Sequence, residues 1–314
     1  IYTLSLHDAL PISQDAFDGG LQALAMDFEQ RFSPARTWSA SRLETYRTCP
    51  FMFFVGNVLG VEPRLEPGEG LDARQLGNIY HRILEAAYRR ALEAAGGAEP
   101  VDLYAALDEI AGPILDAAPT NEGFRATAWW KLTRQGIVDN VRRSLEVLAE
   151  LPGDFVPIGL ELHFAGSSAL VLERGDDRLR LHGVIDRVDV NAGGDIRIID
   201  YKTSGPSEYT NSALENGRKL QVALYALAAR DGLHLGDPVD GFYVHVQQAK
   251  CSSLSLAKYR RGVHAALQAV VEHAWSAVSG ARAGSFEPLP PDSGCPPYCP
   301  AAAFCWQFTP RMGG

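Results

Sequence analysis

The stretch Ile196-Arg-Ile-Ile-Asp200-Tyr-Lys202-Thr predicts a buried strand that ends in charged side chains. Its apolar residues are β-branched, which is typical of strands. Residues two apart on a strand point to the same face, so we expect Asp200 and Lys202 to project together. A carboxylate beside an ammonium suits phosphodiester hydrolysis, because the carboxylate holds a divalent cation and the ammonium stabilises or helps to create the attacking hydroxide. The alternative is a surface ion pair of little consequence.

A second apolar strand is predicted just upstream, from Leu179 to Ile185, and Asp186 closes it. The segment Asn191-Ala-Gly-Gly194 between the two strands is typical of a hairpin turn. If the strands pair through this turn, Asp186 lies beside Asp200. Two carboxylates on neighbouring strands are then close enough to share one metal ion.

The pattern G-x-I-D-R-x-D from Gly183 to Asp189, followed by I-I-D-Y-K-T, resembles the PD-(D/E)XK nuclease superfamily, and within it the RecB/AddB branch. Two further motifs lie where that branch has them. Gly77-Asn-Ile-Tyr-His81 falls on an upstream helix, and Gln221-Val-Ala-Leu-Tyr225 falls on the helix after the lysine strand. The resemblance covers about residues 38–308.

The resemblance implies a site for Mg²⁺ or Mn²⁺. Its metal ligands would be His81, Asp186, Asp200 and the backbone carbonyl of Tyr201, and Lys202 would be the catalytic lysine. Taken by itself, His81 could equally be an ordinary helix histidine satisfied by its neighbours.

The resemblance also extends the catalytic set of Asp186, Asp200 and Lys202 to a Q-x-x-x-Y pair, Gln221 and Tyr225. These two lie one helical turn apart on one face and would border the scissile strand, although an ordinary amphipathic face has the same spacing. Glu161, in Gly159-Leu-Glu-Leu-His163, is a further candidate on the preceding strand, or a plain edge-strand glutamate.

Cysteines form a second group of candidate ligands. Cys295, Cys299 and Cys305 are clustered near the C-terminus, and Cys49 stands far upstream in Tyr46-Arg-Thr-Cys49-Pro-Phe. Soft thiolates gathered in this way suit an iron–sulfur cluster or zinc, and spacing alone does not separate the two. The remaining cysteine, Cys251, is expected to be a free thiol.

The resemblance implies that the four clustered thiolates hold a [4Fe–4S] cluster, since AddB-type nucleases place one cysteine before the core and three after it. The three residues between Cys295 and Cys299 depart from the expected two. Zinc or no metal stay open. No secretory segment is recognised, so we expect a reducing cytoplasm, which disfavours disulfides. A cluster here would close a loop of about 250 residues at considerable entropic cost.

Composition is that of an ordinary globular protein, with 314 residues, 46% apolar and 21% charged. No apolar run is long enough to span a bilayer. The net charge of −9 excludes a general polycation but not a local basic track for DNA. Candidate tracks are Arg89-Arg90, Arg142-Arg143 and Lys258-Tyr-Arg-Arg261, each of which could instead be a solvated helix face.

The expected fold class is α/β, with a restriction-endonuclease-like core: a mixed central sheet flanked by helices, a helical insertion and a Cys-rich metal-binding tail. Ser41-Arg-Leu-Glu44 is a capping-box pattern that should open a short helix. Further helices are expected over 74–95, 102–117, 125–150, 212–231 and 256–281, and strands over 155–165, 168–174, 178–189, 195–202 and 239–247.

Domain boundaries follow from these elements. Residues 1–13 resemble translated sequencing-adapter read-through, so we expect a non-native leader. Residues 14–37 are expected to be a linker or a fragment of an upstream region, 38–308 the nuclease domain, and 309–314 a tail. The domain divides into a helical part (74–150), a catalytic sheet core (155–250) and a helix with the Cys tail (256–308).

The function that the resemblance implies is a metal-dependent deoxyribonuclease, acting as an exonuclease on single-stranded DNA. It would be the nuclease module of a RecB/AddB-type helicase–nuclease in double-strand-break repair and recombination. No G-x-x-x-x-G-K-[ST] motif is present, so a helicase motor would lie upstream or in a partner subunit. Alternatives are an inactive iron–sulfur DNA-binding scaffold and a stand-alone or CRISPR-associated exonuclease.

Overall fold

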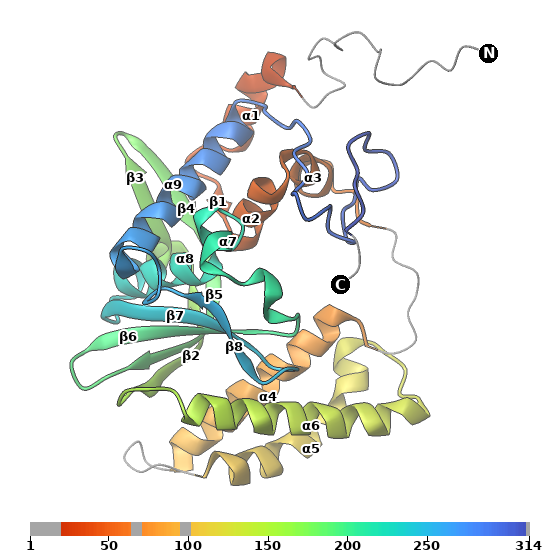
Figure 1. Cartoon of the computed structure of the whole chain (residues 1–314), viewed down its shortest axis with the longest axis vertical. Coiled ribbons are helices and arrows are strands. Elements are labelled where there is room, and N and C mark those ends of the chain that lie inside the picture. The colour runs from red at the N-terminus through yellow and green to blue at the C-terminus, as the bar shows by residue number, and fades with distance from the viewer. Residues whose placement is uncertain (1–19, 64–70, 95–101, 312–314) are drawn as a thin grey trace.

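A mixed five-stranded sheet lies at the centre of the computed structural model, which describes residues 20–63, 71–94 and 102–311 (Figure 1). The sheet contains, in spatial order, β2 (Val156–Phe164), β5 (Gly183–Val190), β6 (Asp195–Lys202), β7 (Asp237–His245) and β8 (Lys250–Ser255). The β5–β6 pair is antiparallel and is joined by the predicted hairpin turn, whereas β6 and β7 are parallel. A parallel pair needs a crossover connection, and α7 (Asn211–Glu215) and α8 (Gln221–Leu227) provide it.

Helical layers cover both faces of this sheet (Figure 1). On one side lie α4 (Ala73–Ala94), α5 (Leu103–Glu122) and α6 (Ala128–Ala149). On the other lie α1 (Ala25–Arg31), α2 (Ala40–Thr48), α8 and α9 (Gly262–Arg282). This sandwich confirms the predicted α/β fold with a mixed sheet between helices.

Strand β6 contributes to both layers because its side chains alternate. Ile196 and Ile198 pack in the apolar core on the α8 side, whereas Ile199 and Tyr201 pack in the core formed with α4 to α6. Burial on both faces accounts for the continuous apolar run at the start of the strand.

A small second sheet has the order β1 (Thr37–Trp38), β4 (Asp177–Leu181) and β3 (Leu170–Arg174). The predicted single strand over 178–189 is therefore wrong, because the chain changes sheets at His182, whose backbone N–H donates to the Trp38 carbonyl. The change occurs next to Gly183, where a Cβ atom would lie 2.8 Å from the Phe164 ring and 3.0 Å from the Tyr225 ring.

Three further predictions need correction. The helix over 212–231 is divided into α7 and α8, and Gly217, with a φ of +77°, lies in the break. The helix expected from 256 begins at Gly262, after an unpredicted strand, β8, whose serine-rich sequence hid its pairing with β7. Helix α2 begins at Ala40 rather than at Ser41, because Ser39 is the N-cap and accepts from the Arg42 N–H.

A buried ion cluster explains the remaining charged residues of the G-x-I-D-R-x-D motif. Asp189 is fully buried, and its carboxylate binds Arg187 of the same strand and Arg197 of β6. The Arg187 guanidinium also lies over the Tyr88 ring of α4 at 4.1 Å. These charges hold β5, β6 and α4 in register, because a buried charge is tolerated only where it is paired.

Some predictions fall outside the described residues, including the leader over 1–13 and most of 309–314. Residues 20–37, expected as a linker or an upstream fragment, contribute Phe28 and Phe32 to the main core. After α2 the chain continues through α3 (Pro50–Phe53) and a π-helical turn, Phe54–Val58. Within the described part of the chain, every helix is too short or too polar to cross a bilayer.

Candidate active site

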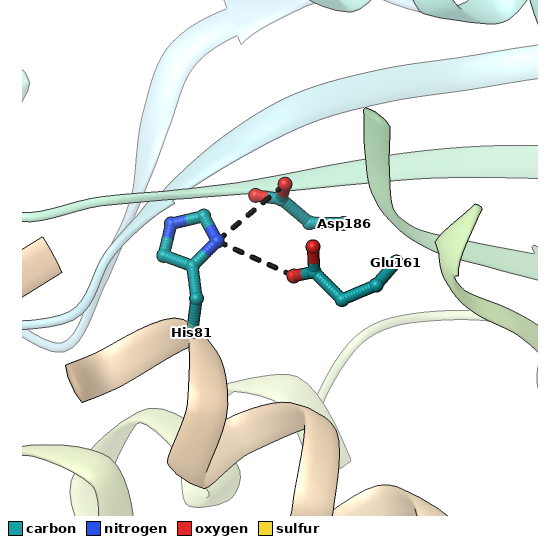
Figure 2. Close-up of side chains that lie close together, drawn as sticks. All are labelled: His81, Glu161 and Asp186. Atoms are coloured by element: carbon teal, nitrogen blue, oxygen red, sulfur yellow. Dashed lines mark ion pairs between the residues drawn. The ribbon is translucent and has the colours of Figure 1, made fainter. Parts of the chain in front are cut away.

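Three candidate ligands from separate elements converge beside the central sheet (Figure 2). His81 lies on α4, Glu161 on β2 and Asp186 on β5. The Nδ1 atom of His81 is 3.4 Å from a Glu161 oxygen and 3.5 Å from an Asp186 oxygen. One imidazole nitrogen and two carboxylates within 4.8 Å of one another form a donor set that a single divalent ion can share.

The backbone holds each of these side chains in place. Asp186 accepts a hydrogen bond of 2.7 Å from the Tyr201 backbone N–H, where the β5–β6 ladder ends. The Nε2 atom of His81 is 3.1 Å from the Tyr201 carbonyl, which thus faces the same cluster. Glu161 has a φ of +48°, a left-handed conformation that is unfavourable for a residue with a Cβ atom. Strain of this kind concentrates at functional sites.

Asp200 and Lys202 project together from the end of β6, as their spacing predicted. The Lys202 ammonium lies 2.5 Å from the Asp200 carboxylate. The Asp200 side chain is fully buried, and within the described residues its oxygens accept no hydrogen bond, so this ion pair is their only compensation. A buried carboxylate with unused lone pairs is costly by itself. The residues therefore fit a cation at this place.

Gln221 and Tyr225 extend the site onto α8. Lys202 donates a hydrogen bond of 2.9 Å to the Gln221 side-chain carbonyl, and the Gln221 amide donates to the Tyr225 hydroxyl at 3.0 Å. The small volume of Gly183 makes room for the Tyr225 ring. Sequence spacing thus correctly predicted that these residues share a face and lie next to the lysine.

The electrostatics of the cluster are those of crowded carboxylates. Burial, and then the nearby Asp200 charge, raise the pKa of Asp186 to about 7. Burial disfavours the charged form of His81, but the carboxylates of Asp186 and Glu161 outweigh it and raise its pKa to about 9. Burial likewise opposes the charge on Lys202, yet Asp200 and Asp186 raise its pKa above the ordinary value. The metal-free site therefore retains protons that a cation would displace.

A surface pocket of about 450 Å³ opens onto this cluster. His81 and Glu161 form its inner wall, and Arg74 and Arg82 lie on the α4 side. The pocket gives solvent and an anionic ligand a path to the ligand cluster, with two guanidinium groups beside it.

Glu44 is a site residue that the sequence reasoning missed, since its position suggested a capping box for its own helix. Its carboxylate instead accepts hydrogen bonds from the backbone N–H groups of Leu220 at 2.6 Å and Gln221 at 2.9 Å. Both lie at the N-terminus of α8, where a negative charge is favourable. Glu44 thus fixes the first turn of the helix that presents Gln221 to Lys202. No local pattern in the sequence connects positions 44 and 220.

Cysteines gather at the junction of α3 and the C-terminal tail, which lie side by side in Figure 1. Cys49, at the start of α3, and Cys299 are buried in one small apolar cluster, and Cys305 packs against it. Burial raises the pKa of the Cys299 thiol, and the thiols of Cys295, Cys49 and Cys305 add to the effect. All five cysteines are unbridged, and Cys251 packs elsewhere, against the α4–α6 core.

The sequence as a whole places this arrangement in a class. Residues 37–306 match the PD-(D/E)XK nuclease superfamily. That stretch is most of the chain, and the protein belongs to this superfamily.

Particular relatives are similar over a shorter region. Both are the B-type subunit of an ATP-dependent helicase/deoxyribonuclease. The chain is 31% identical over 216 residues to the protein from Symbiobacterium thermophilum, covering 64% of this chain and 18% of the relative. It is 28% identical over 255 residues to the protein from Carboxydothermus hydrogenoformans, covering 75% and 23%. The chain therefore spans about a fifth of the length of these relatives.

Glu44→Ala should lower the rate of any reaction at this site, because α8 loses a carboxylate that caps two backbone N–H groups. Glu44→Gln keeps an acceptor oxygen and should recover most of the rate. Loss of such a cap costs about 0.5–2 kcal/mol of stability. Turnover with KM and the unfolding free energy should be measured together, with exposed Glu146→Ala on α6 as the matched control.

A positioning role requires that kcat falls with little change in KM and returns in the glutamine variant. Equal rates in Glu44→Ala and the unaltered protein, or a loss that Glu44→Gln does not repair despite normal stability, would contradict it.

Proposed function

We propose that this chain is a divalent-metal-dependent deoxyribonuclease and the nuclease module of a helicase–nuclease. The observation that carries the proposal is the buried Asp200 carboxylate, held against Lys202 next to the His81–Glu161–Asp186 cluster. Membership in a nuclease superfamily supports the reaction class. The relatives' name, which joins a helicase to a deoxyribonuclease, supports DNA as the substrate and an associated motor.

The residues that would hold Mg²⁺ or Mn²⁺ are His81, Asp186 and Asp200, with the Tyr201 carbonyl as a further donor. Glu161 joins this set, because it lies as close to His81 as Asp186 does. Bound there, a divalent cation would activate water and neutralise charge on the phosphate. The carboxylates orient the cation and, once deprotonated, keep the site anionic.

Lys202 acts in the proposal as a fixed ammonium. Asp200 and Gln221 both accept from it or pair with it, so its position is defined before substrate arrives. An ammonium in a buried site stabilises the charge that develops on the phosphate as the leaving oxygen departs. Gln221 holds Lys202 and is itself held by Tyr225 and by Glu44.

The four cysteines Cys49, Cys295, Cys299 and Cys305 would hold a [4Fe–4S] cluster. Their unbridged, mostly buried thiols at one junction suit a metal site. In tetrahedral zinc, with Zn–S bonds of about 2.3 Å, sulfur atoms lie about 3.8 Å apart. Within the described residues, no three cysteine sulfurs approach one another within 4.8 Å, which favours a larger cluster.

The proposed setting is a motor that delivers single-stranded DNA to an exonuclease site in double-strand-break repair. The helicase would lie in the part of the protein that the relatives have beyond the matched region, or in a partner subunit. A DNA-binding scaffold without catalysis is the competing function, and the first experiment below separates the two.

Asp200→Asn and Lys202→Ala should each reduce cleavage of labelled single-stranded DNA in Mg²⁺ or Mn²⁺. Loss of one charge that stabilises the transition state costs about 10²–10³-fold. DNA binding, measured by fluorescence anisotropy in EDTA, should be nearly unchanged. Exposed Asp231→Asn and Lys131→Ala serve as matched controls. Undiminished cleavage in Asp200→Asn would remove this site from the reaction, and metal-independent cleavage would remove the metal.

Cys299→Ala should abolish the cluster and lower the melting temperature, because the tail is no longer tied to the segment around Cys49. Closure of such a long loop carries a large entropic term. Anaerobically purified protein should contain about four irons per chain, and Cys251→Ala should keep them. Zinc in place of iron would overturn the cluster type. Full thermal stability and full DNA binding in Cys299→Ala would overturn the tie.

A further inference from the structure

The basic tracks suggested by the sequence are neutralised in the structure. Arg89 pairs with Glu85, Arg90 with Glu109, Arg142 with Asp108 and Arg260 with Glu215. These side chains therefore behave as solvated helix faces and offer little net charge to a polyanion. Any concentrated positive potential must lie elsewhere on the described surface.

Three arginines converge on a different pocket, formed by α1, β1 and α2. Arg31, Arg36 and Arg42 line this hollow of about 190 Å³, with the Phe32 and Trp38 rings as its floor. Within the described residues, none of the three guanidinium groups lies within 4.0 Å of a carboxylate oxygen. Burial, and then the charges of Arg31 and Arg36, lower the pKa of Arg42. Such unpaired crowding is unfavourable until an anion arrives.

The pocket is preorganised. The Arg42 guanidinium lies 5.0 Å from the centre of the Trp38 ring, and Arg31 donates a hydrogen bond of 2.9 Å to the Val58 carbonyl. The positive end of α2 lies at the same place, because its N-cap, Ser39, stands between Trp38 and Arg42 in the chain. Fixed guanidinium groups match the oxygens of phosphate well.

We propose that Arg31, Arg36 and Arg42 form a binding site for the phosphodiester backbone of single-stranded DNA, leading to the active site. This proposal rests on the proposed nuclease function. A neighbouring pocket of about 560 Å³ shares Arg31 and Arg36, so the basic surface is longer than one phosphate needs. Phe32 and Trp38 are buried and leave no ring free for base stacking, which favours sequence-independent contacts with the backbone.

The position of the pocket agrees with a strand path. Figure 1 shows α1, β1 and α2 on the same side of the sheet as α8. On α2, Arg42 faces the pocket, and Glu44, two residues later, faces α8. The pocket and Gln221 are thus separated by about one helix diameter, roughly 10–12 Å. At about 3.4 Å or more per nucleotide, a few nucleotides span this distance.

The test measures affinity for a short fluorescent oligothymidine across a series of salt concentrations. It uses the full chain in EDTA with Lys202→Ala, so that no cleavage occurs. Each lost phosphate contact should lower the slope of log Kd against log salt by about 0.7. Such a slope over the decade below 1 M makes binding at 0.1 M salt about fivefold weaker. Arg36→Gln should show this change, and Arg31→Gln/Arg36→Gln about twice the change in slope.

Arg125→Gln is the matched control, because Arg125 is an exposed arginine that lines none of these pockets and its loss removes the same charge. Its slope should equal that of the parent. An unchanged slope in the Arg31/Arg36 variant, with normal melting temperature, would overturn the proposal. Arginine-dependent binding of polyglutamate in place of the oligonucleotide would also overturn it and assign the pocket to an acidic protein segment.

Metal-dependent cleavage by the unaltered chain is measured in parallel. Normal cleavage with an unchanged slope defeats the arginine site alone. A slope that falls as expected, in a protein that cleaves no DNA, supports the arginine site as a DNA contact and defeats the nuclease function.

Discussion

The buried charge pair of Asp200 and Lys202 is the constraint on which the rest of the site depends. Neither group is stable in a protein interior without compensation. Each neighbouring element supplies part of that compensation. Gln221 on α8 accepts from Lys202, and Glu44 on α2 fixes the start of α8. Asp186 takes the Tyr201 N–H at the point where the strands separate. The remaining imbalance is negative, which is why the site is suited to a divalent cation.

Much of this arrangement could be predicted from the sequence, because it depends on short-range periodicity. Alternation along β6 predicted that Asp200 and Lys202 share a face, and helical spacing predicted the same for Gln221 and Tyr225. The Asn-Gly-Gly turn predicted the β5–β6 hairpin. Each of these inferences needs only the geometry of one element or of one tight turn.

The parts that could not be predicted are set by contacts between distant segments. Glu161 occupies its place because of an unusual backbone conformation, and Glu44 because α2 packs against α8. Strand β8 is polar in sequence and forms through its pairing with β7. The break at His182 follows from close packing against Gly183. The unpaired arginines were missed because ion pairing is invisible in sequence, so paired and unpaired cations look alike.

The central claim is that the carboxylates around Asp200 hold a divalent cation. Binding of Mn²⁺ to the metal-free chain, measured by calorimetry between pH 6 and 9, tests it most directly. Metal ligands bind when deprotonated. Because the pKa of Asp186 is raised to about 7 and that of His81 to about 9, affinity should rise with pH and binding should release protons. Asp200→Asn should weaken it. Affinity independent of pH, or no saturable binding, would contradict the account.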